Sequence, residues 1–212
     1  MNIKSNLKEL LVFELKSFIG RNFFRKRPIL FQGKNYLNLG CGNNLINGFV
    51  NADFFYSVWK KKIPKRQWML DLRYNLECED ETFDGIYSEH TLEHLTYSTV
   101  NNLLKELHRI IKKGSIIRIT VPDCNKYVKY YNGDYQNNNF SGVYDSKCLA
   151  MHYFSQAYGH MSIWNFEEMK SALEKAGFTQ VKEMSFQKSQ DNMLMQDIQE
   201  REWETVYVEA TK

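Results

Sequence analysis

The sequence predicts an α/β protein with a mostly parallel sheet of about seven strands, helices on both faces, and an aromatic-rich insertion after the fifth strand. Apolar segments of strand length alternate with amphipathic segments of helix length. The first strand runs directly into Gly40-Cys41-Gly42, a turn in which no side chain blocks the backbone N–H groups. Polar side chains follow later strands, and parallel strands end at one edge of a sheet. These features are typical of a Rossmann-like domain.

Length and composition favour one globular domain. The chain has 212 residues, of which 43% are hydrophobic and 15% aromatic. The net charge of +3 is too small to indicate a nucleic-acid partner by itself. Four cysteines without a CxxC pair and no visible signal peptide favour reduced thiols in a cytoplasmic protein. No apolar run reaches the ~18 residues that a membrane span needs.

Residues 1–32 predict a separate basic, amphipathic helical segment that ends at Pro28. Its apolar positions are Leu7, Leu10, Leu11, Phe13, Phe18, Ile19, Phe23 and Phe24, and its basic positions are Lys4, Lys8, Lys16, Arg21, Arg25, Lys26 and Arg27. Three interpretations stay open. The helix could make peripheral contact with a membrane surface, cover the ligand site as a lid, or simply pack on the domain of residues 33–212.

The glycine loop is followed by a second strand that ends in a carboxylate, Asp53. In a dinucleotide-binding fingerprint the ribose-binding acid lies about 20 residues after the glycines. Here Asp53 follows Gly40 by thirteen positions, and Asn47-Gly48 interrupts the gap. The helix that usually follows the loop must therefore be very short or missing, which argues against NAD.

The rest of the domain alternates in the same way. Strands are predicted at 36–39, 49–53, 68–71, 83–88, 116–121, 181–186 and 205–210. A helix is predicted at 98–112, with Ser98 as its N-cap, and another at 165–177, with Asn165 as its N-cap. The strand ends at Asp53, Asp71 and Ser88 then lie at the same edge as the glycine loop, which predicts a ligand site there.

Residues 124–164 predict an insertion of largely irregular structure. Ten of the forty residues from Asn125 to Trp164 are aromatic, and Asn132-Gly133 and the run 136–139 have turn and loop chemistry. A long segment with this much apolar surface is more typical of a functional lid than of a disordered tail. An aromatic appendage that only packs on the domain is the alternative.

With these pieces in place, the chain resembles the class I S-adenosylmethionine-dependent methyltransferases, most closely the methyltransferase type 11 group. The ordered segments that carry the resemblance are 37–42 (LNLGCG), 49–53 (FVNAD), 70–72 (LDL), 82–95 (TFDGIYSEHTLEHL), 104–114 (LKELHRIIKKG), 117–123 (IRITVPD) and 173–178 (LEKAGF). Bacterial members found among sugar and surface-polysaccharide enzymes are particularly similar.

The resemblance implies a role for each matching position. Gly40 and Gly42 would admit the methionine and ribose part of the cofactor, and Asp53 would accept hydrogen bonds from the ribose hydroxyls. Asp71 with its neighbour would meet the adenine, and 88–90 would line the methionine end. The full implied set is Leu39, Gly40, Cys41, Gly42, Asn43, Asp53, Phe54, Asp71, Leu72, Ser88, Glu89 and His90.

Methyl transfer to a hydroxyl or amine also needs a group that removes a proton. Histidine suits this because its pKa lies near neutrality. His90 and His94 follow the fourth strand, and His160 ends the insertion, so these three are the candidate catalytic residues. Histidines that only hydrogen-bond the cofactor or the loop backbone are the alternative.

His90-Thr-Leu-Glu93-His94 also matches the H-x-x-E-H pattern of some metalloproteases. Its position after a strand at the rim of a glycine-loop sheet argues against a protease. Some O-methyltransferases hold a divalent metal at a related E-x-x-E-H segment, and His90, Glu93 and His94 would be the counterparts. A histidine in the first position favours a softer metal than magnesium. The sequence alone does not favour a resident metal.

We therefore expect a methyltransferase that uses S-adenosylmethionine and methylates an oxygen or nitrogen of a small-molecule or glycan-type acceptor under the insertion. The acceptor class depends on analogy. One alternative is a cofactor-binding protein without catalysis. The other is a nucleic-acid methyltransferase that contacts phosphates through Lys60-Lys61-Lys62, Lys65 and Arg66, although a charge run is usually a solvated face.

Overall fold

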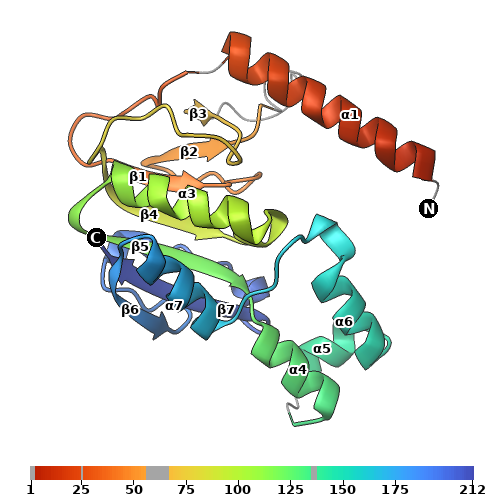
Figure 1. The fold of residues 1–212 in the computed structure, drawn as a ribbon. Coiled ribbons are helices and arrows are strands. Elements are labelled where there is room, and N and C mark those ends of the chain that lie inside the picture. Colours follow the sequence, from red (N-terminus) through yellow and green to blue (C-terminus); the bar gives the residue numbers. More distant parts are fainter. Residues whose placement is uncertain (1–2, 25, 56–66, 135–137) are drawn as a thin grey trace.

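A computed structural model describes residues 3–24, 26–55, 67–134 and 138–212, and its centre is one seven-stranded sheet (Figure 1). The strands lie in the order β3-β2-β1-β4-β5-β7-β6. Their bounds are β1 Tyr36–Leu39, β2 Phe49–Asp53, β3 Trp68–Met69, β4 Phe83–Glu89, β5 Ile111–Pro122, β6 Thr179–Met184 and β7 Thr205–Thr211. The predicted α/β class, with a mostly parallel sheet of about seven strands, is confirmed.

The first five strands pair in parallel, and β7 runs antiparallel between β5 and β6. Strand β1 pairs with β2 on one side and with β4 on the other. The chain therefore reverses its direction across the sheet beside β1. In open α/β sheets, ligands bind at the carboxyl ends of the strands at such a point.

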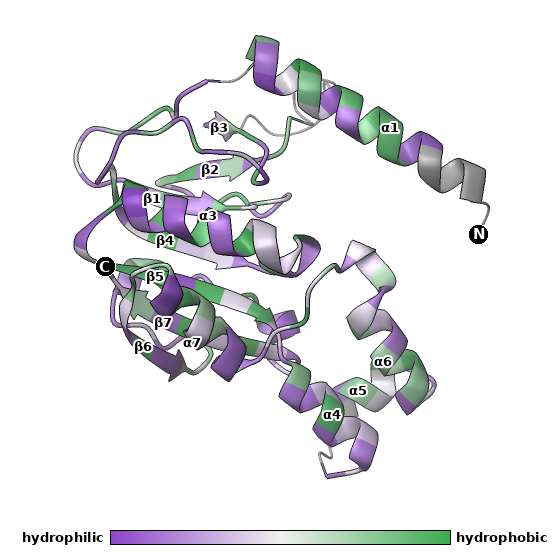
Figure 2. Ribbon diagram, viewed as in Figure 1, coloured by the Kyte–Doolittle hydropathy of each residue, from purple (hydrophilic) through white to green (hydrophobic). Residues whose placement is uncertain are grey.

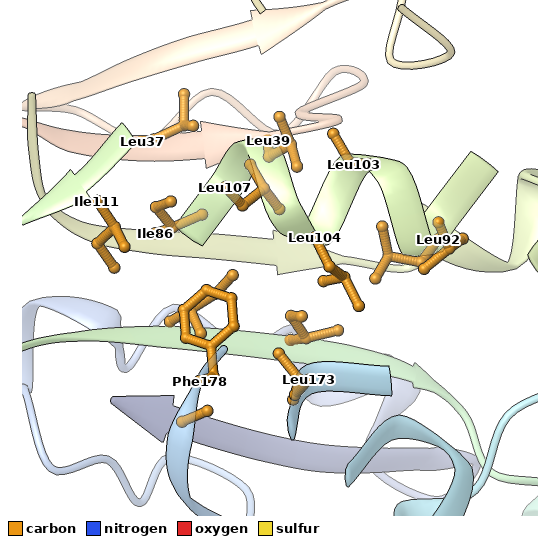
Figure 3. Packing of buried hydrophobic residues seen from close by; sticks show 14 of the residues in the cluster. Leu37, Leu39, Ile86, Leu92, Leu103, Leu104, Leu107, Ile111, Leu173 and Phe178 are labelled. Atoms are coloured by element: carbon orange, nitrogen blue, oxygen red, sulfur yellow. The ribbon is translucent and has the colours of Figure 1, made fainter. Parts of the chain in front are cut away.

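Helices α3 (Tyr97–Ile110) and α7 (Phe166–Lys175) lie side by side on one face of the sheet and close its main core. Figure 3 shows leucines of α3 meeting side chains of β1 and β4, with Leu173 and Phe178 below them. The predicted helix is confirmed, but its N-cap is Thr96, whose side chain accepts a hydrogen bond from the Thr99 N–H. The prediction of Ser98 as N-cap was wrong, because the helix begins one position before it. Asn165 caps α7 as predicted.

The opposite face carries a smaller apolar cluster. Tyr36, Phe49 and Tyr87 point from three strands toward Leu194, which lies in the short helical turn η4 (Asn192–Leu194). A second short turn, η5 (Gln199–Arg201), follows in the same connection. The connection between β6 and β7 thus crosses this face before β7 enters the sheet.

The N-terminal helix α1 (Ile3–Ile19) continues into one wider turn, η1 (Gly20–Phe24). The chain leaves helical structure there, four residues before Pro28, so the predicted helix end was too late. Gly20 packs directly against Phe55 in this turn, and a Cβ at position 20 would lie closer than 3.0 Å to the Phe55 ring. Figure 2 shows polar and apolar residues mixed along α1, and Leu10, Leu11, Leu15 and Phe18 are exposed.

The insertion is largely helical, which corrects the prediction of irregular structure. It contains α4 (Cys124–Asn132), α5 (Asn138–Val143), α6 (Lys147–Ser155) and the turn η3 (Ala157–Gly159). Gly133 ends α4 in the left-handed conformation at φ 89°, so Asn132-Gly133 is a helix stop. The aromatic side chains form a separate small core of Tyr127, Phe140, Tyr144, Ala150 and Phe154.

Of the helices in the described ranges, none is both long enough and apolar enough to cross a bilayer. In the described part of the chain, Cys41, Cys78, Cys124 and Cys148 form no disulfide bond.

Candidate functional site

The glycine loop makes a tight turn at the carboxyl end of β1. The N–H groups of Gly40 and Cys41 both donate to the Ala52 carbonyl of β2, at 2.9 and 3.0 Å. Gly40 has φ 69° and Gly42 has φ 50°, a region that favours glycine. A Cβ at Gly40 would also lie closer than 3.0 Å to the Thr91 side chain. Both conformation and space therefore require glycine at position 40.

Asp53 lies at the end of β2, as predicted, and its carboxylate holds the glycine loop. One oxygen accepts a hydrogen bond from the Gly42 N–H at 2.6 Å, and the other accepts from the Phe54 N–H at 2.5 Å. The short spacing from the loop thus still brings this acid to the glycines. Phe54 stacks on Phe13 of α1, with ring centroids 4.6 Å apart.

Two buried asparagines take the place of the helix that usually follows such a loop. The Asn38 amide donates to the Asn44 carbonyl and to the Asn51 side chain, both at 2.8 Å. Asn51 in turn accepts from the Ile46 N–H and donates to the Ile46 carbonyl. Side chains of β1 and β2 therefore satisfy the loop backbone that a helix would otherwise satisfy. Asparagine inside two predicted strands was the available sequence signal.

Asp71, the predicted adenine contact, is engaged by the N-terminal segment of the chain. One oxygen accepts from the Ser17 hydroxyl of α1 at 2.6 Å, and the Arg73 guanidinium binds both oxygens. Arg73 also binds Glu14 of α1. Burial pushes the pKa of Asp71 upward, but the hydrogen bonds from Arg73 and Ser17 outweigh it, so the net pKa is lowered. Sequence reasoning missed Ser17 and Arg73 as neighbours of this acid.

The end of β4 carries three predicted residues, of which Ser88 contacts the strand that leads into the glycine loop. The Ser88 hydroxyl donates to the Leu39 carbonyl at 3.3 Å. Glu89 accepts a hydrogen bond from the Ile198 N–H at 2.9 Å, and burial raises the pKa of its carboxyl. His90 has a positive φ of 45°, which marks the sharp turn between β4 and the short helical turn η2 (Leu92–His94).

A cavity of about 470 Å³ lies between η2, the insertion and the start of β7. Its lining combines polar groups from the sheet edge with aromatic side chains from the insertion. The polar side chains are His90, Glu93, His94, His160, Arg201 and Glu204, and the aromatic ones are Tyr127, Tyr144, Tyr153, Phe154, Tyr158 and Trp203. The structure therefore brings the three predicted histidines to one cavity under the insertion. Sequence reasoning missed Arg201 and Glu204, which come from the late connection to β7.

His90 is buried at the inner end of this cavity, and its tautomer follows from its neighbour. The Thr205 hydroxyl donates its only proton to the Arg201 carbonyl at 2.7 Å. The contact of 2.7 Å between His90 Nε2 and Thr205 Oγ1 therefore has His90 as the donor. His90 Nδ1 then faces Glu93 at 3.6 Å. Burial, followed by the nearby Arg201 charge, holds the pKa of His90 well below its usual value.

His94 and His160 both line the cavity, and their rings pack edge to face with ring centroids 5.0 Å apart. Burial lowers the pKa of His94, so its imidazole is neutral at pH 7. His160 Nδ1 lies 2.7 Å from the Phe154 carbonyl, which can only accept. The proton of a neutral His160 is therefore on Nδ1, and the lone pair is on Nε2.

Glu93 lies between the histidines, 3.6 Å from His90 and 3.9 Å from His94. Within the described part of the chain, neither of its buried carboxylate oxygens has a hydrogen-bond partner. Burial raises the pKa of Glu93 to about 8. An unsatisfied buried carboxyl group is rare in folded proteins and often marks a functional site.

The basic strip at 60–66 that could contact phosphates lies outside the described residues.

Comparison with known proteins gives one family match. A family model described as a methyltransferase domain matches residues 13–183. No curated protein matches the sequence.

Among solved structures, a SAM-dependent methyltransferase from Archaeoglobus fulgidus is 16% identical, with full coverage of both chains and a TM-score of 0.53. A possible histamine N-methyltransferase from Thermotoga maritima is 18% identical, covering 99% of this chain and 96% of the other, with a TM-score of 0.51. At these identities the likeness shows the fold that they share.

Proposed function

The chain belongs to the methyltransferase-domain family, whose methyl donor is S-adenosylmethionine, and from this premise we propose that it methylates a small molecule in the cavity under the insertion. The main support for the proposal is that one segment, 89–94, contacts both the glycine loop, where the cofactor would bind, and the cavity, where the acceptor would bind. Thr91 donates to the Gly40 carbonyl at 3.3 Å, while Glu93 and His94 line the cavity.

The cofactor half is supported by the carboxyl edge of β1, β2 and β4. The residues of 39–43, 53–54, 71–72 and 88–90 are proposed to hold the cofactor. Gly42 N–H and Asp53 are already in contact, so the acid is within reach of a ribose bound over the loop. The carboxylate of Asp71 would reach adenine only if its contacts with Ser17 or Arg73 rearranged.

The acceptor half is supported by the size and lining of the cavity. A volume of about 470 Å³ falls within the range of ~300–1,000 Å³ typical of small-molecule sites. Its aromatic walls provide apolar faces that suit a planar or sugar-like ring. His90, His94 and His160 stay the candidate proton acceptors. His94 and His160 line the cavity, and burial lowers the pKa of His94, while buried His90 is better placed to position Glu93 and Thr205.

Two measurements test the proposal. Calorimetry should show S-adenosylhomocysteine binding with a Kd in the micromolar range, roughly −8 kcal/mol. Screening of small-molecule and glycan acceptors with methyl-labelled S-adenosylmethionine should then give a labelled product. Absence of binding at millimolar cofactor would contradict the proposal, and binding without transfer to any acceptor would favour a cofactor-binding protein without catalysis.

Asp53→Ala should weaken S-adenosylhomocysteine binding at least tenfold, because the variant loses both the proposed ribose contact and the brace on the Gly42 N–H. The exposed Asp145→Ala in the insertion is the matched control and should bind as the parent protein does. Circular dichroism of both variants checks the fold. Unchanged binding by a folded Asp53→Ala protein would assign the ribose to another residue.

A further inference from the structure

Three side chains in the cavity form a cluster with the chemistry of a metal site. Glu93, His94 and His160 each offer one ligand atom, and these atoms lie within 4.8 Å of one another. Glu93 and His94 come from η2 after β4, whereas His160 comes from the end of the insertion. The cluster therefore joins two parts of the fold that are far apart in sequence.

Glu93 gives an independent reason to expect a cation. Its side chain is 3% exposed, and neither carboxylate oxygen has a hydrogen-bond partner among the described residues. Leaving such a group without a partner costs free energy that a hydrogen bond or a bound cation would recover. The Glu93 side chain also lines the cavity, so a cation entering from solvent can reach it.

His160 is oriented as metal-binding histidines usually are. His160 donates through Nδ1 to the Phe154 carbonyl, which leaves the lone pair of Nε2 available. A backbone carbonyl that holds the other ring nitrogen is the common outer-shell partner of metal-binding histidines. His94 Nε2 lies 3.9 Å from Glu93 Oε1.

The sequence motif alone would select a different trio, with His90 in place of His160. The geometry argues against His90 as a ligand. Although its Nδ1 faces Glu93 at 3.6 Å, His90 is not part of the described cluster whose ligand atoms all lie within 4.8 Å of one another, and its side chain is only 5% exposed. His160 has no counterpart in the H-x-x-E-H pattern, because it lies 66 positions after His94.

We propose that Glu93, His94 and His160 bind one divalent transition metal ion, of which Zn²⁺ is the best match. Two imidazoles and one carboxylate are a ligand set of catalytic zinc sites, which keep a position open for water or substrate. Magnesium and calcium prefer oxygen ligands alone. Zinc–ligand distances of about 2.0–2.1 Å place tetrahedral ligand atoms about 3.4 Å apart. Small side-chain rotations would close the present spacing to that value.

The inference concerns the same cavity as the proposed methyl transfer but does not depend on it, because metal binding is measured without turnover. The 212-residue protein is freed of metal with a chelator and titrated with Zn²⁺ by calorimetry at pH 7.5. We expect one ion per chain with a Kd in the micromolar range or below. Mg²⁺ in the same experiment should show no saturable binding at micromolar concentration.

Glu93→Gln and His160→Asn should each weaken Zn²⁺ binding at least tenfold. His152→Asn is the matched control, because His152 is an exposed histidine of the same insertion and should leave the affinity unchanged. Thermal melting of the metal-free proteins checks that each variant is folded, and His160→Gln provides a second substitution if His160→Asn is not.

Cobalt substitution identifies the ligand type, since Cys78, Cys124 and Cys148 are free thiols that also attract zinc. We expect a Co²⁺ spectrum without a sulfur-to-metal charge-transfer band. A strong band of that kind, zinc affinity that is equal in the folded Glu93→Gln and parent proteins, or no saturable zinc binding would each overturn the proposal.

Discussion

At the scale of single residues, Thr91 limits how the glycine loop can be built. Its hydroxyl contacts the backbone of Gly40 and of Glu89, so it joins the loop after β1 to the loop after β4. The side chain leaves no room for a Cβ at position 40. Gly48, at the other end of the same connection, also has positive φ but meets nothing within 4 Å.

Alanine substitution of Gly40 and of Gly48 distinguishes the cost of backbone strain from the cost of a steric clash, because only the Cβ at position 40 meets another side chain. Gly48→Ala should cost about 1–2 kcal/mol of stability, because an L-residue is strained in the left-handed region. Gly40→Ala should cost a further ~1–3 kcal/mol, because its Cβ must displace Thr91. Urea unfolding of both variants measures the difference. Equal decreases in the free energy of unfolding would show that the Thr91 side chain moves without cost.

At the scale of elements, α1 is held to the domain by a few specific contacts. Ser17 binds Asp71, Glu14 binds Arg73, and Phe13 stacks on Phe54. All three partners lie at the carboxyl ends of β2 and β3, at the proposed adenine and ribose side of the site. Figure 1 shows α1 extending beyond these strands. Among the interpretations open from the sequence, this placement supports a cover over the cofactor side.

Removing the shared arginine should loosen α1. Arg73→Ala breaks the link to both Glu14 and Asp71, so amides of α1 should exchange with deuterium several-fold faster than in the parent protein. Lys8→Ala, at an exposed position of the same helix, is the control and should leave exchange unchanged. Protection that survives Arg73→Ala would mean that the Ser17–Asp71 hydrogen bond and the aromatic stacking hold the helix without Arg73.

The same contacts make α1 docking sensitive to acid. The folded pKa of Asp71 is lowered, so its ionised form contributes stability that is fully present above the usual aspartate pKa of about 3.9. This contribution is lost as the pH falls through the lowered value. The free energy of unfolding should therefore fall more steeply below pH ~4 in the parent protein than in Asp71→Asn. Parallel pH profiles of the two proteins would contradict this.

At the scale of the whole molecule, a buried arginine joins the sheet to the long late connection. Arg118 on β5 binds Asp197 at 2.6 Å and Glu209 on β7 at 3.0 Å, and all three side chains are fully buried. It also donates to the Ser185 and Lys188 carbonyls. These contacts anchor the connection between β6 and β7 to β5. The same connection carries Arg201 and Glu204, which line the cavity.

Arg118→Met should therefore destabilise the protein by about 3–5 kcal/mol, because two buried carboxylates lose their partner. Arg27→Met is the matched control. Arg27 pairs with Glu79 at the surface, where both side chains are at least 70% exposed. Arg27→Met should therefore lower the free energy of unfolding by less than ~1 kcal/mol. Chemical denaturation of both variants measures the two losses, and similar values would show that the buried network adds little.

The sequence predicted the features that depend on local chemistry. Strand period and turn residues located Gly40, Asp53 and Ser88 at one edge of a mostly parallel sheet. Helix periodicity located α3 and α7. The error at the insertion has a local cause as well, because Asn132-Gly133 serves a helix end as readily as a loop.

What the sequence could not predict depends on contacts between distant residues. The Ser17 hydroxyl meets Asp71 across 54 positions, and His160 meets His94 across 66. The missing partner of Glu93 is also invisible in sequence, because it depends on burial that η2, the insertion and β7 create together. Asn38 and Asn51 lie between these two situations. The sequence showed asparagines inside two predicted strands, but it did not show that they hydrogen-bond the backbone of the glycine loop.

The position of β7 has a consequence for how the chain acquires this shape. Its residues are made after every other strand, yet they pair with β5 on one side and β6 on the other. During synthesis β6 has no neighbour in the sheet until β7 emerges, and the β5 edge stays open to pairing with other chains. A nascent chain halted before residue 205 should therefore need chaperone protection.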